Sequence, residues 1–152
     1  MSANDYVVGK NPVTGETISE SVRVLTDGTV LYGSAPEMKL ATVTGVDLNN
    51  AATPALYTVP NEVNCIITKI VLRNASTSLT TVSLSIGQNA SSYNDILANA
   101  THTELTGPTL ATVLSAKTGA IALTPGTVLK LKNNTQQGGA ATCTIDIFGI
   151  LF

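Results

Sequence analysis

The chain has 152 residues, a formal net charge of −2 at pH 7 and a sequence pI near 5.2. This length suits one domain that buries a core without help from a metal or a disulfide. Charged residues make up only 12% of the chain, about half of the usual share. Small polar residues replace them, among them 23 threonines, which favour strands and can face water without charge. The composition therefore predicts an all-β protein whose uncharged surfaces meet other protein.

The charge and its distribution argue against a nucleic-acid partner, because phosphate binding needs clustered Lys and Arg and the eight basic residues here are scattered. No apolar run approaches the roughly 18 residues of a membrane span. The opening MSANDYVVGK lacks the charged and apolar blocks of a signal peptide. We therefore expect synthesis in a cytoplasm and no membrane partner. Cys65 and Cys143 lie in apolar strand patterns without CxxC spacing, and we interpret them as two core thiols in preference to a disulfide.

The first segment of the chain, residues 1–39, differs from the rest and is predicted to form an N-terminal arm. Eight of the eighteen charged residues lie in the first forty positions, and turn-like sequences surround Pro12 and Pro36. Asp27-Gly28 lies between apolar runs, which predicts a hairpin because both residues tolerate a tight turn. A lone hairpin is marginally stable in water. The arm should therefore dock on its own body or on a neighbour.

Residues 40–152 are predicted to form one all-β domain, a β-sandwich or a barrel, because short strands alternate with turn signals at regular spacing. The only helical candidate is 91–100, where we expect one short turn capped by Ser91 or Ser92. The predicted strands are 39–46, 55–59, 65–73, 81–87, 102–105, 112–116, 120–123, 127–132 and 142–152.

Alternation along these strands predicts which faces are buried. Residues 81–86 alternate polar and apolar, so Ser83 and Ser85 are predicted on a wet face. In the strand 65–73, by contrast, Ile66, Ile70 and Leu72 are predicted to point to the core. Apolar residues also occur among the side chains on the opposite face of this strand. The last strand, 142–152, is likewise apolar on both rows. Such strands are central in a sandwich or covered by another subunit. The predicted oligomer interface consists of Ile67, Val71, Phe148, Ile150 and Phe152.

Chemistry-bearing residues are few. His102 and Glu104 would share one strand face and could form a base and its orienter, but no nucleophile motif accompanies them. We therefore interpret the pair as a polar strand edge, and we expect Asp146 to pair with a lysine across the sheet. The loop NNTQQGGA opens no helix that would bind phosphate. We predict no catalytic site, no metal and no cofactor.

Three segments resemble small structural proteins of tailed-bacteriophage virions, which serve as capsid cement or decoration proteins or form head and tail fibres. They are LYTVPNEVNCIITKIVLRNAS, THTELTG and GTVLKLKNNTQQGGAATCTIDIFGILF, and the resemblance covers about residues 40–152. It implies a β-sandwich, often jelly-roll-like, that assembles as a trimer. It also implies an N-terminal arm that reaches across neighbouring capsid subunits. It transfers no functional residue.

Two functional hypotheses follow. In the first, the protein binds the surface of an assembled phage capsid as a homotrimer, with the major capsid protein as its partner. Its arm would then contact that partner through Tyr6, Val7, Val8, Val24, Leu25, Val30, Leu31 and Tyr32. In the second, it is a receptor- or glycan-binding fibre or tail-tip module whose function lies in the loops 91–101 and 133–140.

Overall fold

The computed structural model describes residues 4–10, 17–24, 30–32, 37–117, 119 and 122–152. In these residues the chain forms strands and no helix, so the all-β prediction is confirmed. No described segment is therefore a helix that could span a bilayer. The strands are β1 (Asn4–Lys10), β2 (Thr17–Val24), β3 (Val30–Tyr32), β4 (Met38–Asp47), β5 (Ala55–Thr58), β6 (Cys65–Arg73), β7 (Ser83–Gly87), β8 (Leu97–Thr101), β9 (Ala111–Ser115), β10 (Val128–Thr135) and β11 (Thr142–Leu151).

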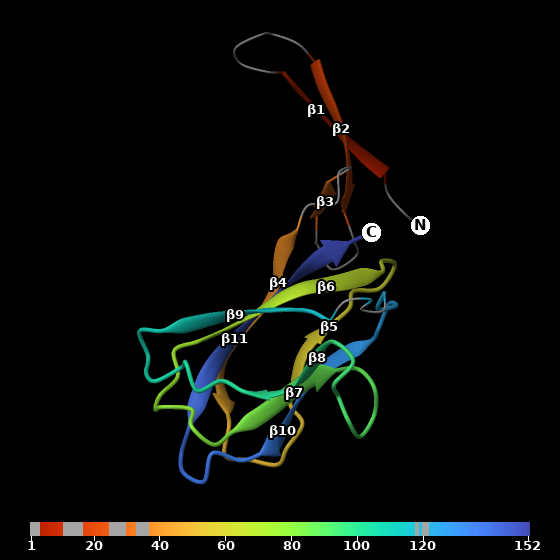
Figure 1. Cartoon of the computed structure of the whole chain (residues 1–152). Coiled ribbons are helices and arrows are strands. Elements are labelled where there is room, and N and C mark those ends of the chain that lie inside the picture. The colour runs from red at the N-terminus through yellow and green to blue at the C-terminus, as the bar shows by residue number, and fades with distance from the viewer. Residues whose placement is uncertain (1–3, 11–16, 25–29, 33–36, 118, 120–121) are drawn as a thin grey trace.

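Strands β4 to β11 form two four-stranded antiparallel sheets that pack face to face (Figure 1). The first sheet has the order β4-β11-β6-β9 and the second the order β5-β10-β7-β8. The predicted β-sandwich is therefore confirmed. The core lies between the sheets and consists of aliphatic side chains with almost no exposure, among them Ile70, Leu72, Leu84, Ile86, Leu129, Leu131, Ile145 and Ile147.

The strands of the sandwich pair in a nested order. β7 pairs with β8, β6 with β9, β5 with β10 and β4 with β11. One long antiparallel hairpin folded across itself would produce this order, and the jelly-roll expectation stays a prediction. The nesting also places the earliest and latest strands of the sandwich side by side, with β11 central in its sheet.

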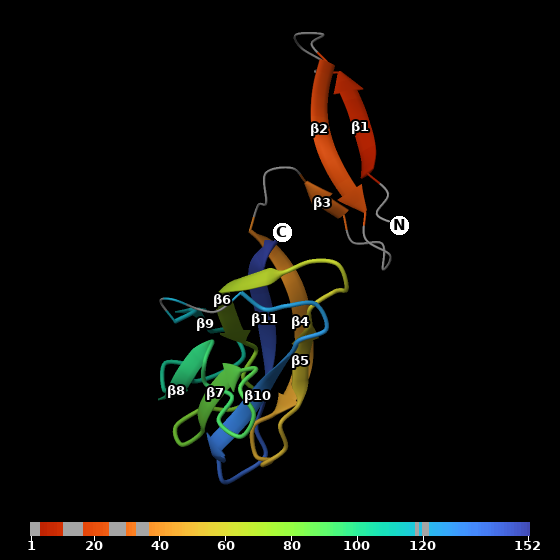
Figure 2. The same cartoon turned by 90° about the vertical axis from the view of Figure 1, so that its right-hand side faces the viewer.

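The N-terminal segment forms a separate sheet of order β1-β2-β3, and none of its strands pairs with a strand of the sandwich. Figure 2 shows this sheet beyond the end of the sandwich where β4 begins and β11 ends. Pairing of Val24 with Val30 agrees with the hairpin that the sequence predicts, although Asp27 and Gly28 lie outside the described residues. The domain boundary near residue 39 stays a prediction.

Most predicted strands of the sandwich are present, with two differences among the described residues. Residues 102–105 form a turn instead of a strand, and β8 at 97–101 lies where a short helical turn was expected. Leu123 makes only an isolated bridge with Cys65. Part of the predicted strand 120–123 lies outside the described residues.

Both neighbours of β11 carry an extra residue near Phe148. The register pairs Phe148 with Lys69 and Gly149 with Ile67, so Thr68 of β6 has no partner position on β11. On β4, Leu40 likewise has no partner position on β11. A bulge shifts the alternation of the strand that carries it. The predicted outer position of Ile67 is therefore wrong, because its side chain is 1% exposed and lies in the core of a single chain.

The outer face of β7 is covered by the segment 88–96, which folds back over it. Ser85 is fully buried there, and its hydroxyl donates to the carbonyl of Ser92 at 3.2 Å. Lys132 from β10 donates to the carbonyl of Ser91 at 2.6 Å. The prediction of a wet face at Ser83 and Ser85 is therefore wrong, because alternation along one strand cannot reveal that a distant segment covers it.

Candidate assembly surface

The outer face of the sheet β4-β11-β6-β9 gathers most of the residues predicted for an oligomer interface. Partners in an antiparallel register point to the same face. One row across the sheet therefore contains Thr42, Asp146, Val71 and Val113, one from each strand in sheet order. The next row contains Lys39, Phe148, Lys69 and Ser115. The face is thus a mixture of apolar side chains and paired charges.

Asp146 is the best-connected charge on this face. Its carboxylate accepts hydrogen bonds from Arg73 Nε at 2.7 Å and from the Thr42 hydroxyl at 2.6 Å. The hydrogen bond from Arg73 is the main reason why the pKa of Asp146 lies below its usual value. The predicted lysine partner is therefore wrong. Arginine suits this position because its planar group can contact both carboxylate oxygens.

A second ion pair connects the beginning of β4 to β6. Lys69 Nζ lies 2.5 Å from a Glu37 carboxylate oxygen, and the hydroxyl of Thr68 donates to the other oxygen. The same ammonium lies 4.9 Å from the centre of the Phe148 ring. The hydrogen bond from Lys69 lowers the pKa of Glu37. Thr68, the extra residue of the bulge, thus holds a carboxylate at the rim of the sheet.

Four of the five predicted interface residues belong to this side of the sheet. Val71, Phe148 and Ile150 are half-buried, and Phe152, which follows β11, is 50% exposed. Ile67 is the exception, for the reason given above. The face therefore carries partly exposed apolar groups, and their role in an oligomer interface stays a prediction.

The residues predicted to contact a capsid subunit belong mostly to the N-terminal sheet. Tyr6, Val7 and Val8 lie in β1, Val24 ends β2, and Val30, Leu31 and Tyr32 make up β3. Leu25 lies outside the described residues. The backbone brings the three groups into one sheet, and their contact with a partner stays a prediction.

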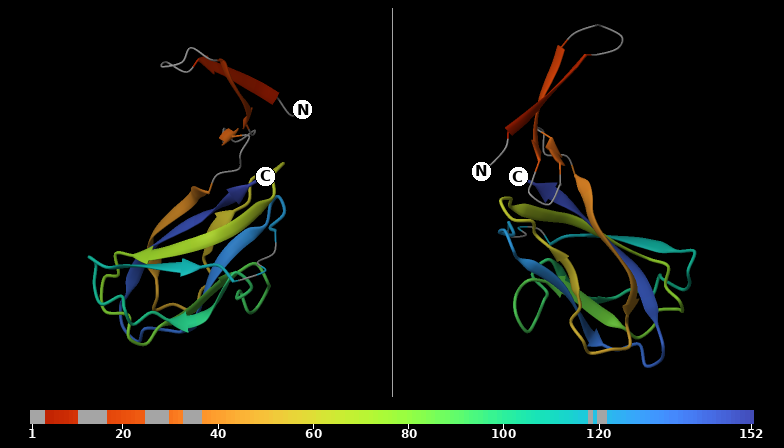
Figure 3. Two further views of the ribbon diagram at one scale, coloured as in Figure 1. Left: turned by 45° about the horizontal axis from the view of Figure 1, so that its top comes forward. Right: turned by 180° about the vertical axis from the view of Figure 1, so that it is seen from behind.

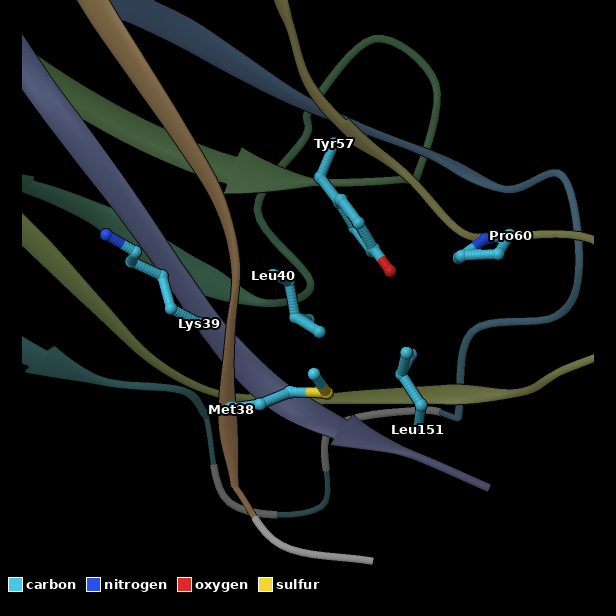
Figure 4. Close-up of a pocket in the computed structure, with 6 residues that line it drawn as sticks. All are labelled: Met38, Lys39, Leu40, Tyr57, Pro60 and Leu151. Atoms are coloured by element: carbon cyan, nitrogen blue, oxygen red, sulfur yellow. The ribbon is translucent and has the colours of Figure 1, made fainter. Parts of the chain in front are cut away.

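A small pocket of about 190 Å³ opens between β4 and β5, at the margin where the two sheets separate (Figure 4). Met38 and Leu40 from β4 and Leu151 from β11 point toward Tyr57, whereas Lys39 points away. Its lining is mostly apolar and holds no acid or histidine. Such a pocket can receive an apolar side chain.

His102 and Glu104 do approach each other, but they do so in a turn and not on a strand face. His102 Nδ1 lies 3.3 Å from Glu104 Oε1, and the histidine is only 5% exposed. Its Nε2 finds no hydrogen-bond partner among the described residues. The described part of the chain contains no group of three or more His, Cys, Asp or Glu side chains that could bind a metal.

The two loops named for receptor binding are both tied to the sandwich. The segment 91–101 includes β8 and part of the cover over β7. In the loop 133–140, the Gln137 side chain accepts from the amides of Thr81 and Val82 at 3.2 and 3.1 Å and donates to the carbonyl of Ser78 at 3.0 Å. Gln137 therefore fastens this loop to the segment before β7, which no sequence motif indicated.

Comparison with known proteins places the chain in no family. No family model matches it, and no curated protein matches it. A chain of the cyanophage Pam1 capsid asymmetric unit is similar at 16% identity, with 77% of this chain and 84% of that chain covered and a TM-score of 0.48. A chain of the acidic stable capsid of Helicobacter pylori bacteriophage KHP30 is similar at 12% identity, covering 77% and 95%, with a TM-score of 0.49.

Proposed function

We propose that this chain is a structural protein of a bacteriophage virion that binds the surface of the assembled capsid as a cement or decoration protein. Its partner in this proposal is the major capsid protein, and the chain has no catalytic role. The observation that carries the proposal is the N-terminal sheet β1-β2-β3, which shares no strand pairing with the sandwich. The resemblance of residues 40–152 to virion structural proteins supports the same assignment.

The two parts of the chain differ in what they need for stability. The sandwich buries its own core between two complete sheets. The N-terminal sheet is a single layer of three strands, and a single layer must bury an apolar face against another element. A neighbouring protein can supply that cover. The sheet is therefore suited to anchor the sandwich to a surface made by other chains.

The fold alone does not choose between a shell-binding and a glycan-binding role, because viral capsid proteins and lectins share sandwich folds of this kind. Sugar recognition generally uses exposed aromatic rings. From residue 37 onward, where the structure describes side chains, only Phe152 is an aromatic residue that is more than a third exposed. Tyr93 is partly buried, and its ring centre lies 5.7 Å from Lys130 Nζ. The small number of exposed aromatic side chains on the sandwich therefore favours shell binding over the receptor- or glycan-binding alternative.

The mechanism in this proposal is mechanical. A protein that binds only the assembled lattice stabilises that lattice by mass action. A homotrimer, with Val71, Phe148 and Ile150 at its contacts, would carry three anchoring sheets. Simultaneous binding of several sheets would raise the overall affinity far above that of one contact.

Deletion of residues 1–36 tests the proposal while leaving Glu37 in place to pair with Lys69. We expect the shortened protein to keep the β-sheet circular dichroism of the sandwich and the oligomeric state of the full chain but to stop sedimenting with empty capsids. A control replaces residues 1–36 with a Gly/Ser segment of equal length and should also fail to bind. Undiminished capsid binding by either variant would contradict the anchoring role. Specific glycan binding by the intact protein would favour the alternative.

A further inference from the structure

Strand β9 forms an open edge of the sandwich. It is the last strand in the order β4-β11-β6-β9 and pairs with β6 from Ala111 to Ser115 without a register shift. Its sequence, ATVLS, contains no charged residue and no proline. A regular, uncharged edge strand is a template for pairing with another chain, and proteins usually block such edges. Figure 3 shows β9, in teal, at the margin of its sheet.

The opposite margin of the sandwich carries the blocking features that β9 lacks. On β4, Lys39 and Asp47 add charge, and a bulge lies between Val43 and Val46 at Gly45, whose φ is +64°. Proline residues lie on both sides of β5, at positions 54 and 60. Charges, bulges and prolines all hinder edge-to-edge pairing. The two margins are therefore protected to different degrees.

Exposed apolar side chains also concentrate at β9. Where the structure describes side chains, from residue 37 onward, three large apolar residues are exposed, and two of them, Val113 at 64% and Leu110 at 43%, lie in β9 or directly before it. Apolar groups that cluster on an open edge favour a protein partner over water. The edge therefore offers side-chain contacts as well as backbone hydrogen bonds.

The backbone groups of β9 that point away from β6 can be assigned from the antiparallel pattern. The amide of Ala116 donates to the carbonyl of Thr68 at 3.0 Å. Because hydrogen-bonded positions alternate along an antiparallel pair, Leu114 and Thr112 also bond toward β6. Their neighbours, Ala111, Val113 and Ser115, then direct their N–H and C=O groups outward. These three residues are symmetric about Val113.

We propose that β9 pairs antiparallel with β9 of a second copy of this chain, around a twofold axis at Val113. In this register Val113 faces Val113, Ala111 faces Ser115 in both directions, and Leu110 faces Ala116. All three outward N–H and C=O pairs find partners, and no like charges meet because the strand is uncharged. The result is one continuous sheet across two copies. The contact is independent of the capsid anchor and requires only the isolated protein.

Charge reversal at the axis tests the proposal on the full-length chain. Val113→Lys and Val113→Glu should both fold, because the side chain is 64% exposed. In sedimentation velocity, we expect the wild-type protein to double its mass as its concentration rises. This holds whether the smaller species is a single chain or an oligomer. Each variant alone should lose this doubling, because like charges meet at the axis, and an equimolar mixture should regain it. Ala98→Lys, which adds the same charge to exposed edge strand β8, should keep it.

Amide hydrogen exchange provides a second reading within the same strand. The amides of Ala111, Val113 and Ser115 should exchange slowly in wild type at high concentration and quickly in Val113→Lys. The amides of Thr112 and Leu114, which bond to β6, should be slow in both. Wild type that does not double, doubling that persists in both single variants, or a mixture that fails to associate would each overturn the proposal.

Discussion

The guanidinium group of Arg73 donates two hydrogen bonds to the carboxylate of Asp146, from Nε to Oδ2 at 2.7 Å and from Nη2 to Oδ1 at 3.3 Å. The pair connects β6 to β11 on the outer face of the sheet, and Asp146 is only 6% exposed. A carboxyl group whose pKa is lower in the folded protein than in the unfolded chain stabilises the fold above its unfolded pKa. That stabilisation disappears as the pH falls through the folded pKa.

Asp146→Asn should therefore destabilise the protein in a pH-dependent way. The variant keeps an acceptor for Thr42 but loses the charge that holds Arg73, so we expect a loss of about 1–2 kcal/mol in the free energy of unfolding at neutral pH. As the pH falls below about 4, the carboxyl group takes up a proton in the unfolded chain before it does so in the folded protein. The difference should therefore shrink, and it should vanish once the pH has fallen through the lowered pKa of the folded protein. Urea unfolding of both proteins across this pH range measures the effect. A difference that is constant with pH would contradict it.

Gly149→Ala should strongly destabilise the sandwich. A Cβ at this position would lie 2.8 Å from Leu40 Cδ1 and still closer to the carbonyl oxygen of Ile66, which belongs to the backbone and cannot turn aside. Overpacking of this kind costs about 1–3 kcal/mol or more. Gly107→Ala is the matched control, because a Cβ there meets no atom within 4 Å. Thermal unfolding should show a lower Tm for the first variant only, and equal melting temperatures would disprove the clash.

Ile67→Ala and Val71→Ala distinguish the core from the outer face of β6. Ile67 is 1% exposed, so its truncation should reduce the free energy of unfolding by about 2–5 kcal/mol through lost burial and a cavity. Val71 is half-buried on the outer face, and its truncation should cost about 1 kcal/mol or less in the single chain. Guanidinium denaturation measures both. Equal losses would mean that the bulge at Thr68 does not move Ile67 into the core.

The two cysteines should be inert in the folded protein. Both thiols are free and buried, and burial raises the pKa of Cys65 and of Cys143 to about 12. A thiol reacts through its thiolate, so labelling with a disulfide reagent at neutral pH should be slow until the chain unfolds. Both should react at once in denaturant. Rapid labelling of the native protein would show that one of them reaches solvent.

The sequence predicts the sandwich well because its strands follow regular patterns. Alternation and turn residues locate most strands of the sandwich, and the inner row of the final strand, with Ile145 and Ile147, lies in the core. Two features could not be predicted in the same way. The bulge at Thr68 depends on the register with β11, and the cover over Ser85 depends on a segment that folds back from elsewhere.

The candidate site shows the same division. Four of the five predicted interface residues lie on the outer face of the sheet or directly after β11. Side chains alternate between the two faces of a strand, and this period of two is enough to group them. The role of Arg73 beside Asp146 was missed because the cross-strand partner depends on a register that one sequence does not reveal. Val113 and the open edge of β9 were missed for another reason. A strand's place at the edge of a sheet is a property of topology and has no local sequence signal.

The nested strand order has a consequence for how the protein folds. β4 pairs with β11, and Thr42 contacts Asp146 across 104 positions of the chain. Chain segments this distant must meet before their contacts compensate for the entropy of closing the loop, which slows folding. On the ribosome, β4 has no strand partner until β11 has emerged, because β4 lies at the edge of its sheet and pairs with β11. The strands that wait unpaired are therefore most vulnerable to aggregation during synthesis, before the sandwich closes.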